Sequence, residues 1–325
     1  MELNKFLAEW HNDNPRILVH TSGSTGKPKP LMVEKRRMLN SARITCDFLG
    51  LKPGDTALLC MPLDYIAGKM MVVRSLQRDL RLTSVRPSSH PLADDALPSF
   101  TFAAMVPMQV YNTLKVPCER ERLMHIRHLI IGGGAISDEL AQMIKPLPNA
   151  VWSTYGMTET LSHIALRRLN GPDASLWYTP FDGVGISLNA DGCLVIDAPE
   201  VCAEPLVTND IAQLRTDDRT GKTLFRIKGR KDNVVCSGGI KIQIEEVEEA
   251  LRPHLSAPFM IVKKQDEMLG EKAILLTEST DLTHIEEICR NTLPKYWVPR
   301  EFLHIARLPL TETGKPKRTL PFTPR

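Results

Sequence analysis

The chain has 325 residues, of which 42% are hydrophobic and 24% are charged, as in an ordinary globular protein. The net charge of +3 is small and no long basic run with interleaved aromatic residues occurs, so we expect no nucleic-acid partner. No run is typical of a membrane span or a signal peptide, which predicts a cytoplasmic protein without membrane insertion. The seven cysteines are scattered, with no C-x-x-C pair, and are predicted to be reduced.

Helical and strand patterns alternate along the first half of the chain. In order, the sequence predicts a helix within 1–16, a helix over 35–50, a strand over 57–61, a helix over 67–78, strands over 101–106 and 128–131, a helix over 137–145 and a strand over 150–153. This alternation predicts an α/β sheet flanked by helices, with ligand loops at the strand ends. Residues 176–228 are predicted to be mostly β. A helix at 245–251 follows, and 254–325 is predicted to be β-α-β.

The stretch 21–29 is rich in glycine and hydroxyl side chains and follows an apolar run. It reads Thr21, Ser22, Gly23, Ser24, Thr25, Gly26, Lys27, Pro28 and Lys29. Glycines allow backbone N–H groups to face an anion, hydroxyls donate further hydrogen bonds, and the lysines add positive charge. Solvent-exposed turns use the same residue types, but this density favours a phosphate-binding loop. The Walker pattern is excluded because Gly23 and Gly26 are too close and Pro28 follows Lys27.

This loop resembles that of the acyl-adenylate-forming enzymes, which include acyl-CoA synthetases, luciferases and peptide-synthetase adenylation domains. Further family signatures follow in the family's order as far as residue 318. The resemblance implies an ATP-dependent carboxylate–CoA ligase that acts through an acyl adenylate, with ATP, Mg²⁺ and coenzyme A bound beside a small-molecule carboxylate. It also implies a large AMP-binding domain, residues 1–230, and a small mobile α+β domain, residues 231–325.

The second signature is Tyr155-Gly156-Met157-Thr158-Glu159, which comes just after a predicted strand. By resemblance, Tyr155 stacks near the adenine, Thr158 contacts the α-phosphate and Glu159 helps to hold Mg²⁺. A carboxylate beside phosphate oxygens is the ligand set that Mg²⁺ prefers. Taken alone, the glutamate could equally be a residue at the start of a helix.

Other signatures complete the implied nucleotide site. The turn Gly132-Gly133-Gly134 would line the adenine, although an ordinary strand-to-helix turn has the same composition. Thr208-Asn209-Asp210 stands where the family has Thr-Gly-Asp, so Asn209 replaces the glycine. By resemblance, Asp210 would bind the ribose and Arg230 would reach the ribose or phosphate. The implied ATP-binding residues are Thr21, Ser22, Gly23, Ser24, Thr25, Gly26, Lys27, Gly132, Gly133, Gly134, Tyr155, Gly156, Asp210 and Arg230.

The last signatures concern the second domain. Asp232 matches the hinge about which the family's C-terminal domain rotates, and Gly238-Gly239 match the segment that lines the pantetheine tunnel of CoA. Lys315 falls on the family's adenylation lysine, whose charge would stabilise the transition state. Together with Thr158 and Glu159 of the second signature, Lys315 is predicted to be catalytic. The glutamates at 245, 246, 248 and 249 are predicted to be a charged helix face.

The acyl pocket is predicted from three residues. Tyr65 stands where the family often has histidine, and Arg74 lies in an apolar helical stretch where a guanidinium needs a partner. The spacing from Gly68 to Arg74 resembles that of the o-succinylbenzoate–CoA ligases of menaquinone synthesis, in which a basic residue meets the succinyl carboxylate. A surface arginine on a half-buried helix is the alternative. His163 would line the pocket or be an ordinary helix residue.

Three alternatives remain open from the sequence. The substrate could be another aryl or fatty acid, the acceptor could be a carrier protein, or the chain could be a non-catalytic adenylate-binding protein. The first signature lies much nearer the start than is usual in the family, so a shortened N-terminal domain is expected. Missing pocket walls would change acyl specificity or require a partner subunit in a homo-oligomer.

Overall fold

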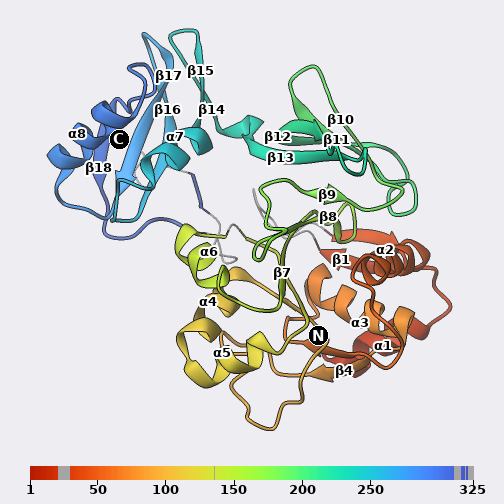
Figure 1. The fold of residues 1–325 in the computed structure, drawn as a ribbon. Helices are drawn as coiled ribbons and strands as arrows, with labels where there is room; N and C mark the ends of the chain where they lie inside the picture. Colours follow the sequence, from red (N-terminus) through yellow and green to blue (C-terminus); the bar gives the residue numbers. More distant parts are fainter. Residues whose placement is uncertain (21–29, 135, 311–315, 319, 321–325) are drawn as a thin grey trace. The chain divides into compact units, whose positions relative to one another are not determined.

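The computed structural model describes residues 1–20, 30–134, 136–310, 316–318 and 320 (Figure 1). Within these residues the helices are α1 (Leu3–His11), α2 (Lys35–Phe48), α3 (Ile66–Arg78), α4 (Pro107–Lys115), α5 (Pro117–Met124), α6 (Asp138–Ile144), α7 (Ile244–Leu251) and α8 (Leu282–Thr292), with a 3₁₀ turn at Lys231–Asn233. None of the described helices is long and apolar enough to cross a bilayer. All seven thiols, each within the described residues, are free.

The strands of the first half are β1 (Arg16–His20), β2 (Pro30–Glu34), β3 (Thr56–Leu59), β4 (Arg81–Ser84), β5 (Phe102–Met105), β6 (His128–Ile131), β7 (Ala150–Gly156), β8 (His163–Arg168) and β9 (Thr179–Pro180). Those of the second half are β10 (Gly185–Leu188), β11 (Cys193–Asp197), β12 (Leu206–Thr216), β13 (Thr223–Arg230), β14 (Val234–Ser237), β15 (Ile240–Gln243), β16 (Phe259–Asp266), β17 (Gly270–Thr277) and β18 (Glu301–His304). The fold is mixed α/β, as predicted.

The chain divides into two compact units. The first comprises Met1–Ser187, Ile196–Leu206 and Leu214–Arg226, and the second comprises Leu188–Val195, Val207–Gln213 and Ile227–Arg325. A four-stranded sheet has the order β10-β11-β12-β13. The last continuous stretch of the second unit begins at Ile227; the domain boundary at 230/231 stays a prediction.

The first unit is built on a seven-stranded sheet in the order β4-β3-β5-β6-β7-β8-β9 (Figure 1). Strands β4, β3, β5, β6 and β7 are parallel, whereas β8 and β9 are antiparallel to their neighbours. β5 and β6 are almost wholly apolar and buried, as expected of parallel strands covered on both faces. Helix α3 packs on β3 and β4, α2 packs on α3, and α4 packs on α5 and α6.

Strands β1 and β2 stand on either side of residues 21–29 in the chain and pair in antiparallel fashion. β1 pairs with β2 from Arg16↔Glu34 to His20↔Pro30. The sequence did not predict β2, whose five residues separate the loop from helix α2. Its exposed face and its proline at the first position give a weak strand pattern.

The second unit contains a mixed sheet with two helices. The order is β15-β14-β17-β16, with β18 paired in parallel to β17. Helices α7 and α8 cover one face over a buried apolar cluster that includes Val247, Leu275 and Ile285. The prediction of β-α-β for 254–325 is wrong by one strand, because the buried β16 and β17 form a hairpin before α8.

Candidate functional site

Three of the predicted signatures lie at the same edge of the parallel sheet. Tyr65 follows β3, Gly132 follows β6, and Glu159 follows β7. Because β3, β5, β6 and β7 run parallel, their carboxyl ends meet at one edge, where ligands bind in open α/β sheets. The fold therefore brings these signatures to one side of the first unit.

The turn after β7 is held in a tight conformation by Thr160. The buried Thr160 hydroxyl accepts from the N–H of Met157 at 2.9 Å and lies 2.6 Å from the carbonyl oxygen of Ser162. Leu161 has φ +65, a left-handed conformation that is uncommon for a non-glycine residue. The turn leaves Glu159 exposed and Thr158 buried. The carboxylate is thus presented to solvent on a fixed backbone.

Two glycines beside this turn cannot carry a side chain. A Cβ at Gly156 would lie 2.3 Å from the carbonyl oxygen of Ser162, and a Cβ at Gly132 would lie 2.5 Å from the Thr154 hydroxyl. Gly133 has φ +80, and the Cβ position of Gly134 has ordinary contact with Pro107. The glycines at 132 and 156 are therefore required by close packing at the strand ends.

Tyr155 belongs to an aromatic cluster. Its ring meets Phe225 edge-on with 5.0 Å between centroids, and it lies 5.7 Å from the ring of Tyr178. The Tyr178 hydroxyl lies 2.9 Å from the Ser153 hydroxyl. This packing gives Tyr155 a fixed ring; the proposed contact with adenine stays a prediction.

Arg74 is enclosed in the first unit. It lies on α3 and is 2% exposed, so the alternative of a surface arginine is wrong. Burial lowers its pKa to about 10. One nitrogen, Nη2, donates to the Ser162 hydroxyl, and Nη1 lies 3.9 Å from the sulfur of Met71. Nε is buried without a hydrogen-bond partner in the described part of the chain.

His163 lies on strand β8, so its interpretation as a helix residue is wrong. Its ring is 7% exposed and packs edge-on against Phe181. Burial, together with the charge of Arg74, holds the pKa of His163 well below its usual value. The imidazole is therefore neutral at physiological pH.

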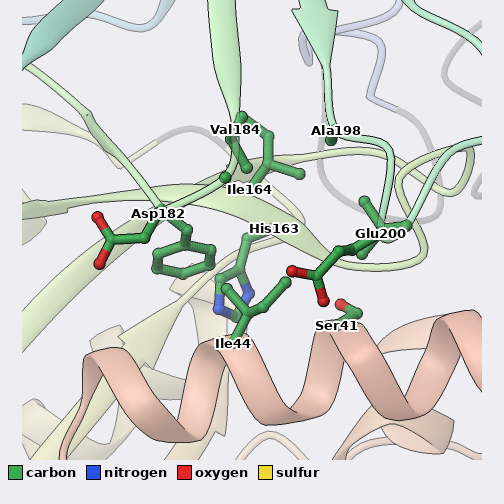
Figure 2. A pocket seen from close by; sticks show the side chains of 11 residues that line it. Ser41, Ile44, His163, Ile164, Asp182, Val184, Ala198 and Glu200 are labelled. Carbon is green, nitrogen blue, oxygen red and sulfur yellow. The ribbon is translucent and has the colours of Figure 1, made fainter.

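His163 also lines a pocket above helix α2 (Figure 2). The walls are mostly apolar, with Asp182 and Glu200 on opposite sides. Both carboxylates have cationic partners, because Lys222 contacts Asp182 and Arg43 contacts Glu200. Neither Arg74 nor Tyr65 is among the residues that line this pocket. Of the three residues predicted for the acyl site, Tyr65, Arg74 and His163, only His163 therefore lines this pocket.

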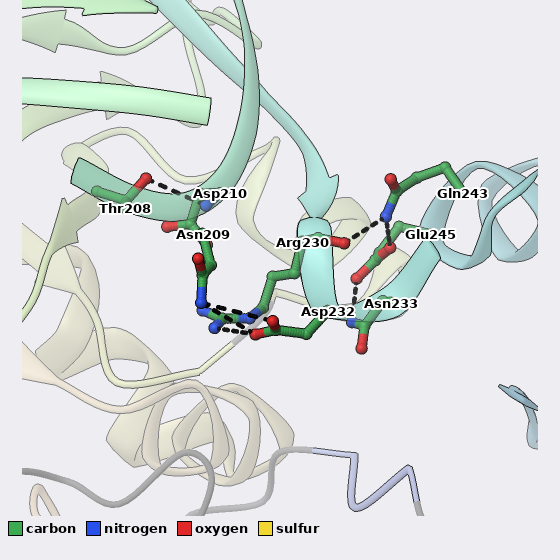
Figure 3. Close-up of polar contacts among 8 residues, drawn as sticks. All are labelled: Thr208, Asn209, Asp210, Arg230, Asp232, Asn233, Gln243 and Glu245. Carbon is green, nitrogen blue, oxygen red and sulfur yellow. Dashed lines mark hydrogen bonds and ion pairs between the residues drawn. The ribbon is translucent and has the colours of Figure 1, made fainter. Parts of the chain in front are cut away.

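The second unit brings Asp210, Arg230 and Asp232 together (Figure 3). Arg230 donates from Nη1 to Asp210 at 3.2 Å and from Nη2 to Asp232 at 2.8 Å. Burial acts to lower the pKa of Arg230, but the hydrogen bond to Asp232 and the charge of Asp210 raise it overall. The predicted ribose ligand and the predicted hinge residue thus share one guanidinium.

Asn209 takes part in the same cluster. Its side-chain nitrogen lies 3.4 and 3.5 Å from the two carboxylate oxygens of Asp232, at the limit of a hydrogen bond (Figure 3). Gly229 precedes the arginine, and a Cβ there would meet Gln243 at 2.4 Å. The turn Gly238-Gly239 joins β14 to β15, and both glycines have positive φ.

The loop 21–29 and Lys315 lie outside the described residues, and their roles stay predictions. The strand that leads into the loop is anchored by the buried Lys69, whose Nζ donates to the carbonyl oxygen of Leu18 at 2.6 Å. Burial lowers the pKa of Lys69. This hydrogen bond ties the middle of β1 to helix α3.

Comparison with known proteins identifies the family. The model of the AMP-binding enzyme family matches residues 4–203, more than half of the chain. The chain belongs to this family. It is an adenylate-forming acyl-CoA ligase of the AMP-forming type, as the sequence predicted.

Relatives within the AMP-binding family differ in the share of their own length that this chain covers. An acyl-CoA synthetase (AMP-forming)/AMP-acid ligase II-like protein from Dyadobacter fermentans has 33% identity and a TM-score of 0.67, with 97% of this chain and 91% of that chain covered. The 2-succinylbenzoate–CoA ligase of Bacillus mycoides is 25% identical over 94% of this chain and 69% of its own. The o-succinylbenzoate coenzyme A synthetase of Bacillus subtilis, solved with ATP and magnesium ion, has 23% identity and a TM-score of 0.73, with coverage of 93% and 68%, and shares the fold.

The sequence did not indicate several residues that hold the family's signatures in place. Thr160 fixes the turn beside Thr158 and Glu159, while Thr45 and Ser162 contact His163. Thr45 is 118 positions from His163, and Ser162 is 88 positions from Arg74, so no local pattern indicates these two contacts. Only the T-x-T spacing of residues 158–160 offered a local signal, since hydroxyl residues commonly hydrogen-bond to nearby backbone in turns.

Proposed function

We propose that this AMP-binding enzyme converts o-succinylbenzoate to o-succinylbenzoyl-CoA. In the first step a substrate carboxylate oxygen attacks the α-phosphorus of ATP, which forms the acyl adenylate and releases pyrophosphate. In the second step the thiol of coenzyme A attacks the acyl carbonyl carbon, loses its proton and releases AMP. The matches to 2-succinylbenzoate–CoA ligases support this choice of substrate within the family.

Arg74 is the observation that carries the proposal. A buried guanidinium is costly unless an anion or several hydrogen bonds compensate it. Within the described residues it has one hydroxyl partner and a weak sulfur contact, while Nε has no partner. A substrate with a second carboxylate would supply the missing anion in the geometry that a guanidinium fork favours.

A carboxylate reaches this guanidinium when Met71 moves away from Nη1. Met71 is wholly buried, but its unbranched thioether chain adapts readily to a new neighbour. The sulfur is a weak acceptor, so a carboxylate oxygen in its place gives a stronger interaction with the arginine. Substrate binding would thus exchange a packing contact for a charge-assisted hydrogen bond.

The remaining roles follow the family signatures. Lys315 would stabilise charge at the α-phosphate, with Thr158 beside it, and the loop at 21–29 would hold the outer phosphates. Asp232 would be the hinge for rotation of residues 231–325, and Gly238-Gly239 would border the pantetheine of coenzyme A. Tyr65, exposed just before α3, would form part of the acyl site with Arg74 and His163.

Glu159 fits the role of a magnesium ligand. Its carboxylate is exposed on the fixed turn after β7, and Mg²⁺ prefers one or two carboxylates together with phosphate oxygens. No group of three His, Cys, Asp or Glu side chains in the described chain could hold a metal ion by itself. Such an ion would therefore complete its ligands with nucleotide phosphates and water, and would neutralise charge on the phosphates.

The proposal is tested by ATP–pyrophosphate exchange with a panel of acids. The panel holds o-succinylbenzoate, its methyl ester at the succinyl carboxylate, benzoate and a fatty acid. We expect exchange with o-succinylbenzoate and at least tenfold less with the ester, because a charge-assisted hydrogen bond is lost. Equal exchange with acid and ester would contradict the proposed substrate, and exchange with the fatty acid alone would assign a different acyl group.

Variants of Arg74 sharpen this test. Arg74→Ala should remove the preference for the diacid over the ester, whereas Arg74→Lys should keep part of it because the charge remains. Arg78→Ala is the matched control, since Arg78 is one turn along the same helix and pairs with Asp47. The preference should survive in this control. Loss of preference in both alanine variants would mean that the helix, not Arg74, determines selectivity.

A further inference from the structure

A continuous chain of polar side chains leads from Arg74 into helix α2. Nη2 of Arg74 donates to the Ser162 hydroxyl, which lies 3.2 Å from Nδ1 of His163. On the other side of the ring, Nε2 of His163 lies 3.2 Å from the Thr45 hydroxyl. Thr45 in turn lies 3.0 Å from the carbonyl oxygen of Ser41. Three separate segments of the first unit, α2, α3 and residues 162–163, therefore meet around one imidazole.

The direction of each hydrogen bond follows from chemistry. The Ser41 carbonyl oxygen can only accept, so the Thr45 hydroxyl donates to it. Thr45 has then used its single hydrogen and must accept from Nε2 of His163. A neutral imidazole with its proton on Nε2 has an acceptor at Nδ1, to which the Ser162 hydroxyl donates. The Ser162 oxygen then accepts from Arg74 through a remaining lone pair.

The surroundings of the ring are consistent with this assignment. The groups near the imidazole are the Arg74 cation, two hydroxyls and the ring of Phe181, with Asp182 and Glu200, each paired with a cation, in the walls of the same pocket. Burial also raises the pKa of the neighbouring Cys46 thiol, so that this group carries no charge near Arg74. No carboxylate that hydrogen-bonds to His163 or Arg74 is found among the described residues. Protonation of the imidazole would place two buried cations side by side.

We infer that Thr45, His163 and Ser162 are positioning residues that orient the Arg74 guanidinium and thereby set selectivity for a second carboxylate on the acyl substrate. This inference rests on the proposed function. The chain holds Nη2 on Ser162, while among the described residues Nε has no partner and Nη1 has only the Met71 sulfur. A guanidinium fixed in this way loses little freedom when a carboxylate binds, and binding to a preorganised group is stronger.

Replacement of Thr45 tests this chain at its far end. Thr45→Val keeps the shape of the side chain but leaves Nε2–H of His163 without an acceptor. We expect KM for o-succinylbenzoate to rise about tenfold, a change that corresponds to the free energy of one hydrogen bond. The kcat value and the KM for benzoate should change by less than about twofold. Thr45→Ser retains the hydroxyl and should restore the wild-type KM. An unchanged KM in Thr45→Val would overturn the inference.

Ser162→Ala provides a second variant that does not alter α2. It removes the hydroxyl between Arg74 and His163 and should raise the KM of the diacid by a similar factor without changing the KM of benzoate. Equal increases for both acids in Ser162→Ala would show a general loss of structure and would contradict a positioning role. Thermal unfolding of each variant identifies any that does not fold.

A separate measurement does not depend on the substrate. The ¹⁵N chemical shifts of the His163 imidazole report its tautomer, and we expect a neutral ring with the proton on Nε2 between pH 6 and pH 8. A proton on Nδ1, or titration within this range, would contradict the hydrogen-bond chain even if the diacid is used. Conversely, the expected tautomer with no diacid preference in the wild type would reject the proposed substrate and the selectivity role that rests on it.

Discussion

Arg318 forms a two-pronged ion pair with Glu248, with nitrogen–oxygen distances of 2.5 and 2.8 Å. The same guanidinium donates to the carbonyl oxygen of Ile261 at 2.7 Å, and the N–H of Ile261 donates to Glu248. Both side chains are largely buried, so the prediction that Glu248 belongs to a charged helix face is wrong. Arg318 lies three residues after Lys315 in the sequence, and its side chain is anchored to α7 and β16.

Loss of this anchor should affect both stability and adenylation. Arg318→Ala leaves the Glu248 carboxylate buried without its partner, which costs about 3 kcal/mol. If Lys315 is catalytic, pyrophosphate exchange should fall at temperatures where the variant is still folded. Arg290→Ala is the control, because its pair with Glu286 is exposed and should contribute little. Full exchange activity in folded Arg318→Ala would show that Lys315 acts without this anchor.

Gly156 should not tolerate a side chain. A Cβ at this position lies 2.3 Å from the Ser162 carbonyl oxygen and 2.4 Å from Cα of His163, and neither backbone atom can move independently. Gly156→Ala should lower stability by about 2 kcal/mol or more and displace the turn that carries Glu159. Gly185→Ala is a suitable control, because its Cβ would have an ordinary 3.5 Å contact. Similar unfolding midpoints for the two variants would contradict this account.

Acid should destabilise the protein through His128. Burial, followed by the charges of Arg127 and Arg168, lowers the pKa of His128 to about 4, and neither ring nitrogen has a hydrogen-bond partner among the described residues. The unfolded chain binds this proton near pH 6.5 and the folded chain near pH 4, so stability falls as the pH drops through that window. The slope for this one proton is at most about 1.4 kcal/mol per pH unit, and less because His128 as a whole is only half-buried.

His128→Phe measures this contribution. Phenylalanine retains an aromatic ring but cannot take up a proton, so chemical unfolding of the variant should depend less on pH between 6.5 and 4. His11→Gln, at an exposed histidine of α1, should leave the pH dependence as it is in the wild type. An identical pH dependence in His128→Phe and wild type would assign acid sensitivity to other groups, of which buried His163 is the first to examine.

The sequence predicted those elements of the first unit in which apolar strands, glycine turns and helices alternate clearly, but it did not predict β2, β4, α4 and α5. Strand β6 has the bounds that the sequence predicted, and its apolar run ends directly at Gly132. The contacts that organise the site were not predictable. Thr45 and His163 are 118 positions apart, and Glu248 and Arg318 are 70 apart. Periodicity indicates which face of an element is apolar, but it does not indicate which polar side chains meet across the fold.

Arg230 should be more important for nucleotide binding than its neighbour Asn209. Removal of Arg230 takes away a cation that contacts both Asp210 and Asp232, and so leaves more negative charge near the proposed site of an anionic nucleotide. Arg230→Ala should raise the KM for ATP by about tenfold or more, which corresponds to the free energy of one hydrogen bond to a charged group. Asn209→Gly restores the family's usual residue and removes only contacts of 3.4 and 3.5 Å, so its KM should change by less than about twofold. A large effect of Asn209→Gly with a small effect of Arg230→Ala would mean that the asparagine, and not the shared guanidinium, holds Asp232 in place.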